Sequence, residues 1–378
     1  MSFRILHLNF HRGWGGQPAR ILLGSIELAR RGHTIGIAAP GDGALAARAR
    51  EAGLAVFGDF KFYKPKRALS LARDVRELRR VIEQFRPEIL HSHGSQDTWS
   101  TVLANRFGGP RLPHLLTRHN SKRVACNAAN RWLYGSVLDR LVVVSGGVLE
   151  RYEEFFRRGV LDPAAIPIIP SSIDFERYNA PLDPGRIRRE IGVPDGTPLV
   201  GSVGRLVQDK GHHVLLRAFR EVLAVRPGAR LVVVGTGTEE SNLRRLAAEL
   251  GIAGAVHFLG FRNDVPDITA ALDVTVLASI DCDASPAVAK EAMYLRRPVV
   301  VTDIGGLREM IEDGVTGRIV PPGEPAPLAA AIVGILSSPG PARVMAERAR
   351  EVVRTRYTIE AMADAYERVY RALLASCA

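Results

Sequence analysis

Cysteine is scarce in this chain of 378 residues, and long apolar runs are missing. The three cysteines, Cys126, Cys282 and Cys377, are widely spaced and odd in number, which gives neither a disulfide framework nor a zinc pattern. No apolar run approaches the roughly 20 residues that span a bilayer. The opening MSFRILHLNF has a charged, strand-like character and not the shape of a signal peptide. These absences predict a protein of the reducing cytoplasm.

Two glycine signatures of nucleotide sites are also missing. No G-x-G-x-x-G fingerprint follows a strand-like segment, and no Walker loop is present. An NAD-dependent oxidoreductase is therefore disfavoured. Aromatic residues make up only 6% of the chain and no recognition motif accompanies the basic residues, so a nucleic-acid partner is not expected.

The positive charge is confined to the first half of the chain. The net charge is +11, and residues 1–180 hold 27 Lys/Arg against 16 Asp/Glu, whereas residues 181–378 hold 24 of each. The densest part, residues 61–80, has eight basic and two acidic residues. Apolar residues at helical spacing predict an amphipathic helix through this part: Ala68, Leu71, Val75, Leu78, Ile82 and Phe85. Its basic outer face either solubilises a core helix or attracts an anionic membrane surface or an anionic acceptor.

Both halves alternate short apolar runs with longer helical patterns, which is typical of parallel α/β units. Strands are expected at residues 5–10, 34–39, 89–93, 114–117 and 141–145, and again at 199–203, 231–234, 256–259, 274–277 and 299–302. Helices are expected between strands, as at 18–31 and 67–85, and two more close the chain at 340–376. A loop-rich stretch at 171–185 marks a boundary. We predict two doubly wound, Rossmann-like domains, 1–180 and 181–355, with a helix in 356–378 that packs back toward the first.

Two such domains facing each other form a cleft at the carboxyl ends of their strands, where open α/β sheets bind ligands. The loops that follow strands are therefore the places to search for chemistry. In the first of these loops, Gly15 and Gly16 let the backbone approach a ligand, and a helix is expected to begin near Gln17 or Pro18. The alternative is an ordinary strand-to-helix turn.

Arg205 and Lys210 follow the first strand of the second half, with Gly204 and Gly211 beside them. Two cations at a strand end suit a diphosphate group, which gains negative charge when its bond to a sugar breaks. The alternative is a pair of solvated surface cations.

His119 follows another expected strand, and Arg118, Lys122 and Arg123 cluster around it. A lone histidine is often only a satisfied core or surface residue. His91, His93 and Asp97 form a second set, which suggests a metal site. Because the two histidines alternate on a strand, we expect one of them to face the core.

Two carboxylates, Asp283 and Glu291, lie eight residues apart around a Ser285-Pro286 helix start. If a helix begins near Ser285, its unpaired amides and positive dipole end attract phosphate. Glu291 is then expected about two turns further along. Carboxylates beside such an end can accept hydrogen bonds from sugar hydroxyls, so the segment indicates a nucleotide-sugar site. The alternative is a solvated helix face.

Taken together, these segments resemble the retaining family-4 glycosyltransferases, which have the GT-B fold. The stretch from Asp283 to Glu291 is similar to the family's E-x7-E region, with Asp in place of the first Glu and without the common G-F-G-L sequence. Residues 202–211 resemble its G-R-L-x-x-x-K-G segment, and the Gly15-Gly16 loop its GG-x-x-R loop. Residues 91–99, 117–123 and 130–145 further resemble bacterial members that build lipopolysaccharide or other cell-envelope glycans.

The resemblance implies a role for each site residue. Glu291 would hold the ribose and Asp283 the donor sugar hydroxyls, Arg205 and Lys210 would stabilise the departing diphosphate, and His119 would contact the donor sugar. Further donor contacts are implied at Gly15, Gly16, Gly204, Arg262, Ser285, Pro286 and Ala287. The loop of Arg262 would read the nucleobase through its backbone, and Ser145 matches a further strand-end position or caps the next helix.

The function implied is metal-independent transfer from a nucleotide-sugar to an envelope glycan or lipid-linked acceptor, without a cofactor. The protein would act in the cytoplasm, with residues 61–80 on an anionic membrane surface. Two alternatives stay open. One is a nucleotide-sugar 2-epimerase, which has a similar two-domain fold but which the Arg205 and Lys210 pattern disfavours, and the other is a non-catalytic nucleotide-sugar-binding protein, which the Asp at position 283 makes conceivable.

Overall fold

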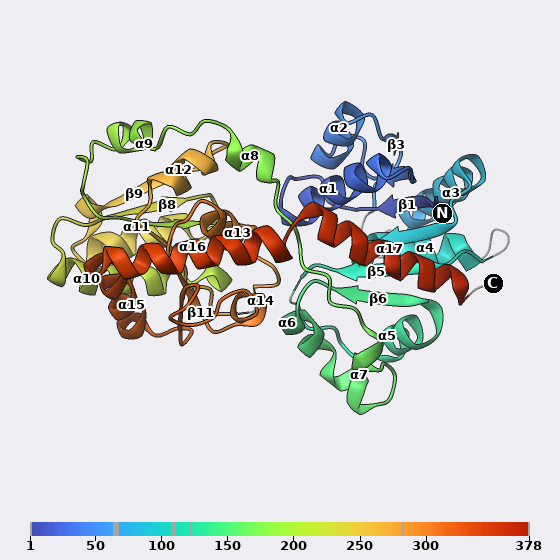
Figure 1. Ribbon diagram of the computed structural model, residues 1–378. Coiled ribbons are helices and arrows are strands. Elements are labelled where there is room, and N and C mark those ends of the chain that lie inside the picture. The colour runs from blue at the N-terminus through green and yellow to red at the C-terminus, as the bar shows by residue number, and fades with distance from the viewer. Residues whose placement is uncertain (1, 63–67, 107–110, 121, 282, 377–378) are drawn as a thin grey trace. The chain divides into compact units, whose positions relative to one another are not determined.

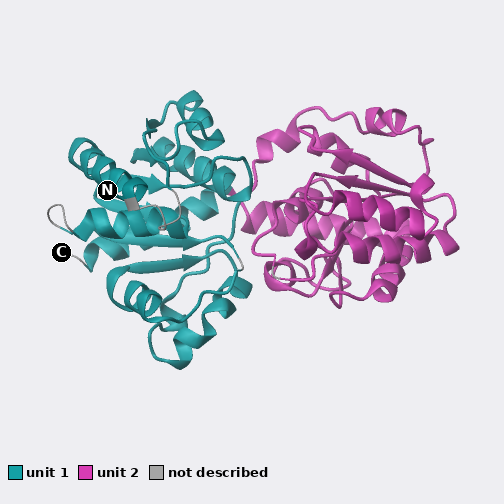
Figure 2. Cartoon of the chain, turned by 180° about the vertical axis from the view of Figure 1, so that it is seen from behind, with its two compact units in different colours: residues 1–172, 359–378 teal, residues 173–358 magenta. Residues whose placement is uncertain are grey.

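The computed structural model of the protein describes residues 2–62, 68–106, 111–120, 122–281 and 283–376. The chain divides into two compact units (Figure 2). Unit 1 comprises Met1–Ser172 with Ile359–Ala378, and unit 2 comprises Ile173–Thr358. Two of the three cysteines, Cys282 and Cys377, lie outside the described residues.

Unit 1 is built on a parallel six-stranded sheet with the order β3-β2-β1-β4-β5-β6 (Figure 1). Its strands are β1 (Arg4–Leu8), β2 (Thr34–Ala38), β3 (Ala55–Phe57), β4 (Ile89–Ser92), β5 (His114–Arg118) and β6 (Arg140–Val143). The central strands are buried almost throughout, as expected of a parallel sheet that is covered on both faces.

Helices cover the faces of this sheet. They are α1 (Gly16–Arg30), α2 (Ala44–Glu51), α3 (Ala68–Phe85), α4 (Ser95–Arg106), α5 (Ala128–Trp132), α6 (Gly146–Leu149), α7 (Glu153–Arg157) and α17 (Ile359–Ala375). The last helix joins the core of unit 1, because Met362, Tyr366 and Tyr370 pack with Phe3 and Ile5 (Figure 1).

The amphipathic helix expected in the basic segment is α3. Leu78 and Phe85 are buried against the sheet, and Val75 and Ile82 are partly buried beside them. Three of the basic residues of this segment, Lys64, Lys66 and Arg67, lie outside the described residues.

Unit 2 repeats the same topology with the sheet order β12-β11-β10-β7-β8-β9. Its strands are β7 (Leu199–Val203), β8 (Arg230–Val234), β9 (Val256–Gly260), β10 (Val274–Leu277), β11 (Val299–Thr302) and β12 (Arg318–Val320). Its helices are α8 (Phe175–Asn179), α9 (Pro184–Glu190), α10 (His212–Val225), α11 (Glu240–Glu249), α12 (Val265–Ala271), α13 (Ala287–Tyr294), α14 (Gly305–Arg308), α15 (Pro325–Ser337) and α16 (Pro339–Arg356).

In each unit the first strand lies at the centre and the chain then winds outward on either side, which confirms the predicted doubly wound fold. Within the described residues, ten strands correspond to the predicted ones, and the strands that the sequence missed are β3 and β12. Both are edge strands of three residues, too short to show a period.

Among the described residues, no single helix is long and apolar enough to cross a membrane. Two consecutive segments, Pro325–Ser337 and Pro339–Ala375, reach the length and apolar composition of a membrane span only when they are taken together. The chain bends by 103° at the break between them.

Candidate functional site

The loop after β7 carries Gly204, Arg205 and Lys210 and is held by its neighbours. Its backbone pairs with the loop after β8, because Gly204 N donates to Val234 O at 2.9 Å and Leu206 N donates to Thr236 O at 3.0 Å. These bonds keep the loop at the carboxyl end of the sheet, where the sequence predicted ligand chemistry.

Gly211 brings this loop against the loop after β10. It has a left-handed backbone with φ 64°, and a Cβ there would lie 1.9 Å from the carbonyl oxygen of Ala278. Next to this contact, Ile280 N donates to Asp209 O at 2.9 Å. Only glycine permits so close an approach, and Lys210, which precedes it, is thereby placed beside the loop that leads to Asp283.

Lys210 and Asp283 form an ion pair at the end of these loops. The Lys210 Nζ lies 2.5 Å from Asp283 Oδ2, and their side chains are 26% and 10% exposed. The Ser279 hydroxyl donates to the same oxygen at 3.0 Å, and Gly306 N donates to the Asp283 carbonyl at 3.0 Å. Asp283 is therefore held by three contacts. Its Oδ1 can still accept a hydrogen bond, and two N–H groups of Lys210 can still donate one.

The helix after this loop begins later than predicted. It is α13, which starts at Ala287 behind the N-cap Pro286 and not at Ser285. Glu291 lies four residues into α13, so the prediction of two turns is wrong and the distance is about one turn. Burial raises the pKa of the Glu291 carboxyl, and the nearby Tyr178 hydroxyl acts in the opposite direction.

Lys290, which the sequence analysis missed, holds the start of this segment. Its side chain is fully buried, its Nζ donates to Ser285 Oγ at 2.8 Å, and it lies 5.1 Å from the centre of the Tyr357 ring. A lysine is almost never fully buried without a partner, so a charged residue amid the apolar stretch before Glu291 was the signal that could have identified it.

Two predicted donor contacts remain open to a ligand. Arg205 is exposed, and the described part of the chain offers its guanidinium no ion pair or hydrogen bond. A Cβ at Gly204 would meet nothing within 4 Å. Packing within unit 2 therefore does not require glycine at position 204.

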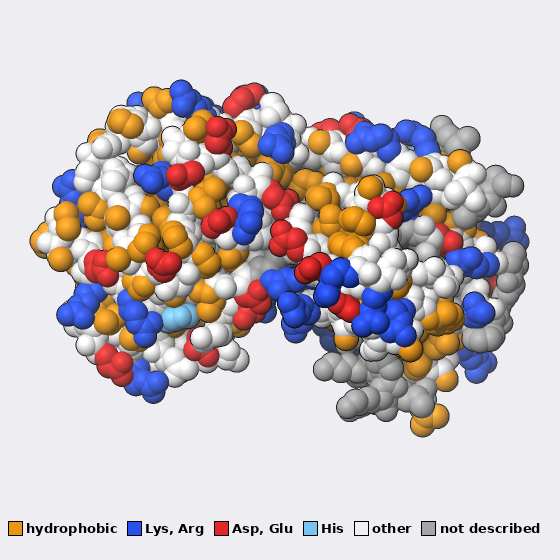
Figure 3. Space-filling view, turned by 90° about the horizontal axis from the view of Figure 1, so that it is seen from below, with side chains coloured by type: hydrophobic (Ala, Val, Ile, Leu, Met, Phe, Trp, Pro, Cys, Tyr) orange, Lys and Arg blue, Asp and Glu red, His pale blue; other side chains and the backbone are white. Residues whose placement is uncertain are grey.

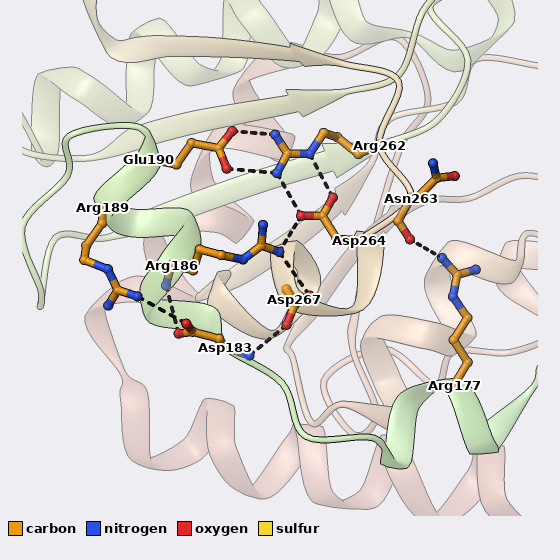
Figure 4. A network of polar contacts seen from close by, with 9 residues as sticks. All are labelled: Arg177, Asp183, Arg186, Arg189, Glu190, Arg262, Asn263, Asp264 and Asp267. Carbon is orange, nitrogen blue, oxygen red and sulfur yellow. Dashed lines mark hydrogen bonds and ion pairs between the residues drawn. The ribbon is translucent and has the colours of Figure 1, made fainter.

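Arg262 is different, because unit 2 already occupies its side chain. Its guanidinium makes two hydrogen bonds of 2.8 Å to Asp264 and pairs with Glu190 at the end of α9 (Figure 4). Arg186 extends the network to Asp264 and Asp267. The guanidinium thus ties α9 to the β9–α12 loop, and the expected contact to a base falls to other groups of this loop, such as its backbone.

In unit 1, Gly15 and Gly16 lie at the start of α1, which begins at Gly16, slightly before the predicted position. Gly15 has an extended backbone with φ 175°, and a Cβ on either glycine would meet nothing within 4 Å. No neighbour in the described chain requires glycine there. Ser145 caps α6 by accepting from Val148 N, which confirms the alternative considered for it.

His119 ends a row of three hydrogen-bonded imidazoles. The His7 Nδ1 lies 2.9 Å from His93 Nε2, and the His93 Nδ1 lies 2.9 Å from His119 Nε2. Burial lowers the pKa of each ring, that of His7 to about 3. The rings are therefore neutral near pH 7, and each carries one N–H.

The direction of these bonds decides which proton His119 presents. If His7 donates, His93 donates in turn, and the proton of His119 lies on Nδ1. The reverse order would place a proton on His7 Nε2, which is buried without a partner among the described groups. An orphaned buried N–H is the rarer defect, so the order that leaves His119 with an Nδ1–H donor is favoured.

Among the described residues, the structure does not group Asp97 with His91 and His93, the set considered for a metal ion in a protein expected to be metal-independent. Asp97 is turned away, since its Oδ2 accepts from the backbone N–H of His93 and of Gly94. His91 and His93 are both buried, so the expectation that only one faces the core is wrong, because residues two apart share a face of a strand.

His7, His91 and His93 offer ligand atoms within 4.8 Å of one another. Both nitrogens of His91 are used by Tyr370 and Thr117, and both of His93 by the other rings. These hydrogen bonds account for the cluster without an ion.

Unit 2 also holds a cavity of about 440 Å³, lined by His213, Val214, Arg217, Ile280, Pro322, Gly323 and Pro325. None of the predicted donor residues lines it, although its lining residue Ile280 contacts the loop that carries Lys210.

Two family models match the chain. Residues 184–352 match the model described as glycosyl transferases group 1, and residues 14–177 match glycosyltransferase family 4. An uncharacterized glycosyltransferase of Methanocaldococcus jannaschii is 35% identical over 321 residues, which are 80% of each chain. The lipopolysaccharide core biosynthesis glycosyltransferase LpsE of Rhizobium meliloti is 35% identical over 179 residues, 47% of this chain and 51% of that protein.

Solved structures share the fold over the full length. A glycosyltransferase of Rickettsia africae superposes with a TM-score of 0.86 at 21% identity, covering 99% of both chains. Anabaena HepE in complex with UDP and glucose superposes with a TM-score of 0.83 at 21% identity, covering 98% of this chain and 100% of that one. Several curated relatives are matched over only 51%, 54% or 66% of their own length.

Proposed function

Because the chain belongs to glycosyltransferase family 4, a family of retaining hexosyltransferases with the GT-B fold, we propose that it transfers a sugar from a nucleotide-sugar donor to an envelope glycan or lipid-linked acceptor. The donor is a substrate, and neither a cofactor nor a metal ion takes part.

The ion pair between Lys210 and Asp283 is the observation that carries this function. A lysine with two spare N–H groups next to a carboxylate with a spare oxygen matches a donor whose phosphate and sugar hydroxyls lie side by side. In this assignment Lys210 and the unpaired Arg205 bind the diphosphate. Asp283, oriented by Ser279, accepts a hydrogen bond from a sugar hydroxyl through Oδ1.

The nucleoside is assigned to the segment around α13. Glu291 accepts hydrogen bonds from the ribose hydroxyls, and the backbone at Ser285, Pro286 and Ala287 faces the phosphates. Gly204 admits the donor to the backbone: a Cβ there would enter open space, so packing within unit 2 does not account for the glycine. The fully buried Lys290 supports this segment through Ser285.

The reaction is assigned to front-face displacement. The acceptor hydroxyl oxygen bonds to the anomeric carbon as the bond from that carbon to the leaving phosphate breaks, and the acceptor proton passes to the leaving phosphate oxygen. No side chain is then required as a nucleophile. His119, neutral and with its proton on Nδ1, donates a hydrogen bond to the donor sugar and is not the general base. Gly15 and Gly16 of unit 1 leave the backbone accessible to the phosphates.

The acceptor is proposed to be an envelope glycan or lipid at the inner face of the cytoplasmic membrane. LpsE supports the glycan, and the excess of basic residues in the first half supports the anionic surface. On the face drawn in Figure 3, however, Asp and Glu lie among the Lys and Arg side chains. We therefore expect attachment to be weak and to disappear at high salt.

The test is binding and turnover of a UDP-sugar by the parent protein and by Glu291→Gln. The variant should weaken UDP binding about tenfold or more with the fold intact, since a hydrogen bond to a charged group contributes about 1.5–3 kcal/mol. Unchanged UDP affinity would remove the ribose role. Sugar release without an acceptor, or transfer to one, separates an enzyme from a non-catalytic binder, and inversion at carbon 2 of the sugar would indicate an epimerase.

A further inference from the structure

A pocket in unit 1 opens at the carboxyl ends of β4 and β5. Its volume is about 170 Å³, and it is lined by Ser95, Thr98, Trp99, Leu116, Arg118, Arg123, Val124, Ala125, Asn130, Leu133 and Tyr134. A water takes up about 30 Å³ in the liquid, so the pocket has room for a phosphate and part of a sugar ring.

The lining offers hydrogen-bond donors that the described groups leave largely unused. Arg118 makes a single bond, from NH2 to the Lys122 carbonyl at 3.3 Å, and its buried Nε has no partner among the described groups. Arg123 is exposed, and no described residue pairs with it. The Tyr134 hydroxyl accepts from Tyr152 at 3.2 Å, so its own O–H is left to donate.

Among the residues that the structure describes, no carboxylate forms an ion pair with Arg118 or Arg123. From residue 98 to residue 138 the sequence contains six Lys/Arg and no Asp or Glu. The two acidic residues at the ends of this stretch already have partners. Asp139 pairs with Arg111 at 2.6 Å, and Asp97 accepts hydrogen bonds from two backbone N–H groups. Positive charge with forked, unused donors is the arrangement that recognises phosphate or carboxylate oxygens.

We propose that this pocket binds an anionic substituent, a phosphate or a carboxylate, carried by the acceptor glycan. Arg118 and Arg123 hold the oxyanion, and Trp99 provides the apolar wall for the sugar ring. This inference rests on the proposed function. It specifies that the proposed acceptor is negatively charged. Arg118 lines the pocket and directly precedes His119, which is assigned to the proposed reaction centre.

Calorimetric titration of the full chain at low salt tests the pocket directly. The probes are glucose 6-phosphate, glucuronic acid, inorganic phosphate and glucose, with UDP in a separate titration. Glucose 6-phosphate or glucuronic acid should bind more tightly than glucose, and the tighter of the two identifies the anion. Tryptophan emission should change with binding, because Trp99 lines the pocket.

The variants are Arg118→Gln and Arg123→Gln, with Arg131→Gln as the matched control. Arg131 belongs to the same acid-free stretch but does not line the pocket. Each pocket variant should weaken binding of the charged sugar about tenfold or more, while UDP affinity and the control stay unchanged. Arg123→Gln keeps the test valid if Arg118→Gln disturbs its loop, since Arg123 has no described bond to lose.

Four results would contradict the proposal that this pocket binds an anionic sugar. They are equal binding of charged and neutral sugars by the parent, unchanged affinity in both variants, a parallel loss of UDP affinity, and binding of inorganic phosphate as tight as that of the charged sugars. The last would show a site for free phosphate only. If neither the parent nor any variant binds UDP, the proposed function is contradicted. The pocket proposal is still supported in that case if Arg123→Gln weakens binding of the charged sugar.

Discussion

Gly211→Ala is the substitution that should damage the donor site most from a single added methyl group. Gly211 has φ 64°, and its Cβ would lie 1.9 Å from the carbonyl oxygen of Ala278. The loops after β7 and β10 would have to move apart by more than an ångström to reach an ordinary contact. Lys210 lies on the first loop and Asp283 beyond the second, so their ion pair would be lost with this movement.

The cost has two parts. A left-handed backbone costs an alanine about 1–2 kcal/mol. Forcing a methyl group into filled space costs about 1–3 kcal/mol more. The free energy of unfolding should therefore fall by about 2–5 kcal/mol. Urea denaturation followed by far-UV circular dichroism measures this loss. Tryptophan emission monitors unit 1 separately, because all three tryptophans lie there: Trp14, Trp99 and Trp132.

Substitutions at two other glycines of unit 2 distinguish the backbone cost from the cost of the steric clash. Gly192 has φ 65° and open space around its Cβ, so Gly192→Ala should cost only the backbone part. Gly204 has neither constraint, and Gly204→Ala should leave stability within about 0.5 kcal/mol of the parent while it weakens donor binding. If Gly211→Ala costs no more than Gly192→Ala and binds UDP normally, the close contact of the two loops does not hold the site together.

Two further predictions concern charge. Lys210→Met and Arg205→Gln should each lower turnover about 10² to 10³-fold, as loss of one donor to a developing oxyanion does, and a fall below tenfold in both would remove the diphosphate role. His7→Phe should make stability less sensitive to acid. The pKa of His7 is lowered from 6.5 in the unfolded chain to about 3 by burial, so the unfolded state binds the extra proton as the pH falls below 6.5 and stability drops. Between pH 7.5 and 5.5 this histidine contributes a loss of about 1.4 kcal/mol, which His7→Phe should abolish in paired urea titrations. An unchanged pH dependence would mean that His7 is protonated in the folded protein.

Much of the fold could be predicted from the spacing of apolar residues and from the loop residues between them. The strands of parallel sheets are continuous apolar runs, and ten of them stood out because both of their faces are buried. The strands β3 and β12 did not, since three residues at a sheet edge carry no pattern. The closing helices α16 and α17 were visible in the sequence, whereas the residues at which the chain leaves and re-enters unit 1 depend on contacts between distant segments.

Sequence position indicates candidate site residues but not the partners that they contact. Strand-end placement indicated Lys210, Asp283 and His119, but sequence spacing does not show that Lys210 pairs with Asp283 across two loops. The role of His7 was also hidden, because its neighbours, His91 and His93, come from β4 and the residue after it. Arg262 misled for the same reason, since its carboxylate partners lie on α9 and in the β9–α12 loop.

The most direct test of the central assignment is a thermal-shift panel of UDP-, GDP- and ADP-sugars with NAD as control, on the parent and on Lys210→Met. A ligand at a hundred times its Kd adds about 2.7 kcal/mol of stability, which raises the melting temperature measurably. We expect one nucleotide-sugar class to raise the melting temperature of the parent, and the shift to shrink in Lys210→Met. A shift with NAD alone, or a nucleotide-sugar shift of equal size in both proteins, would contradict the assignment of the donor to the Lys210–Asp283 site.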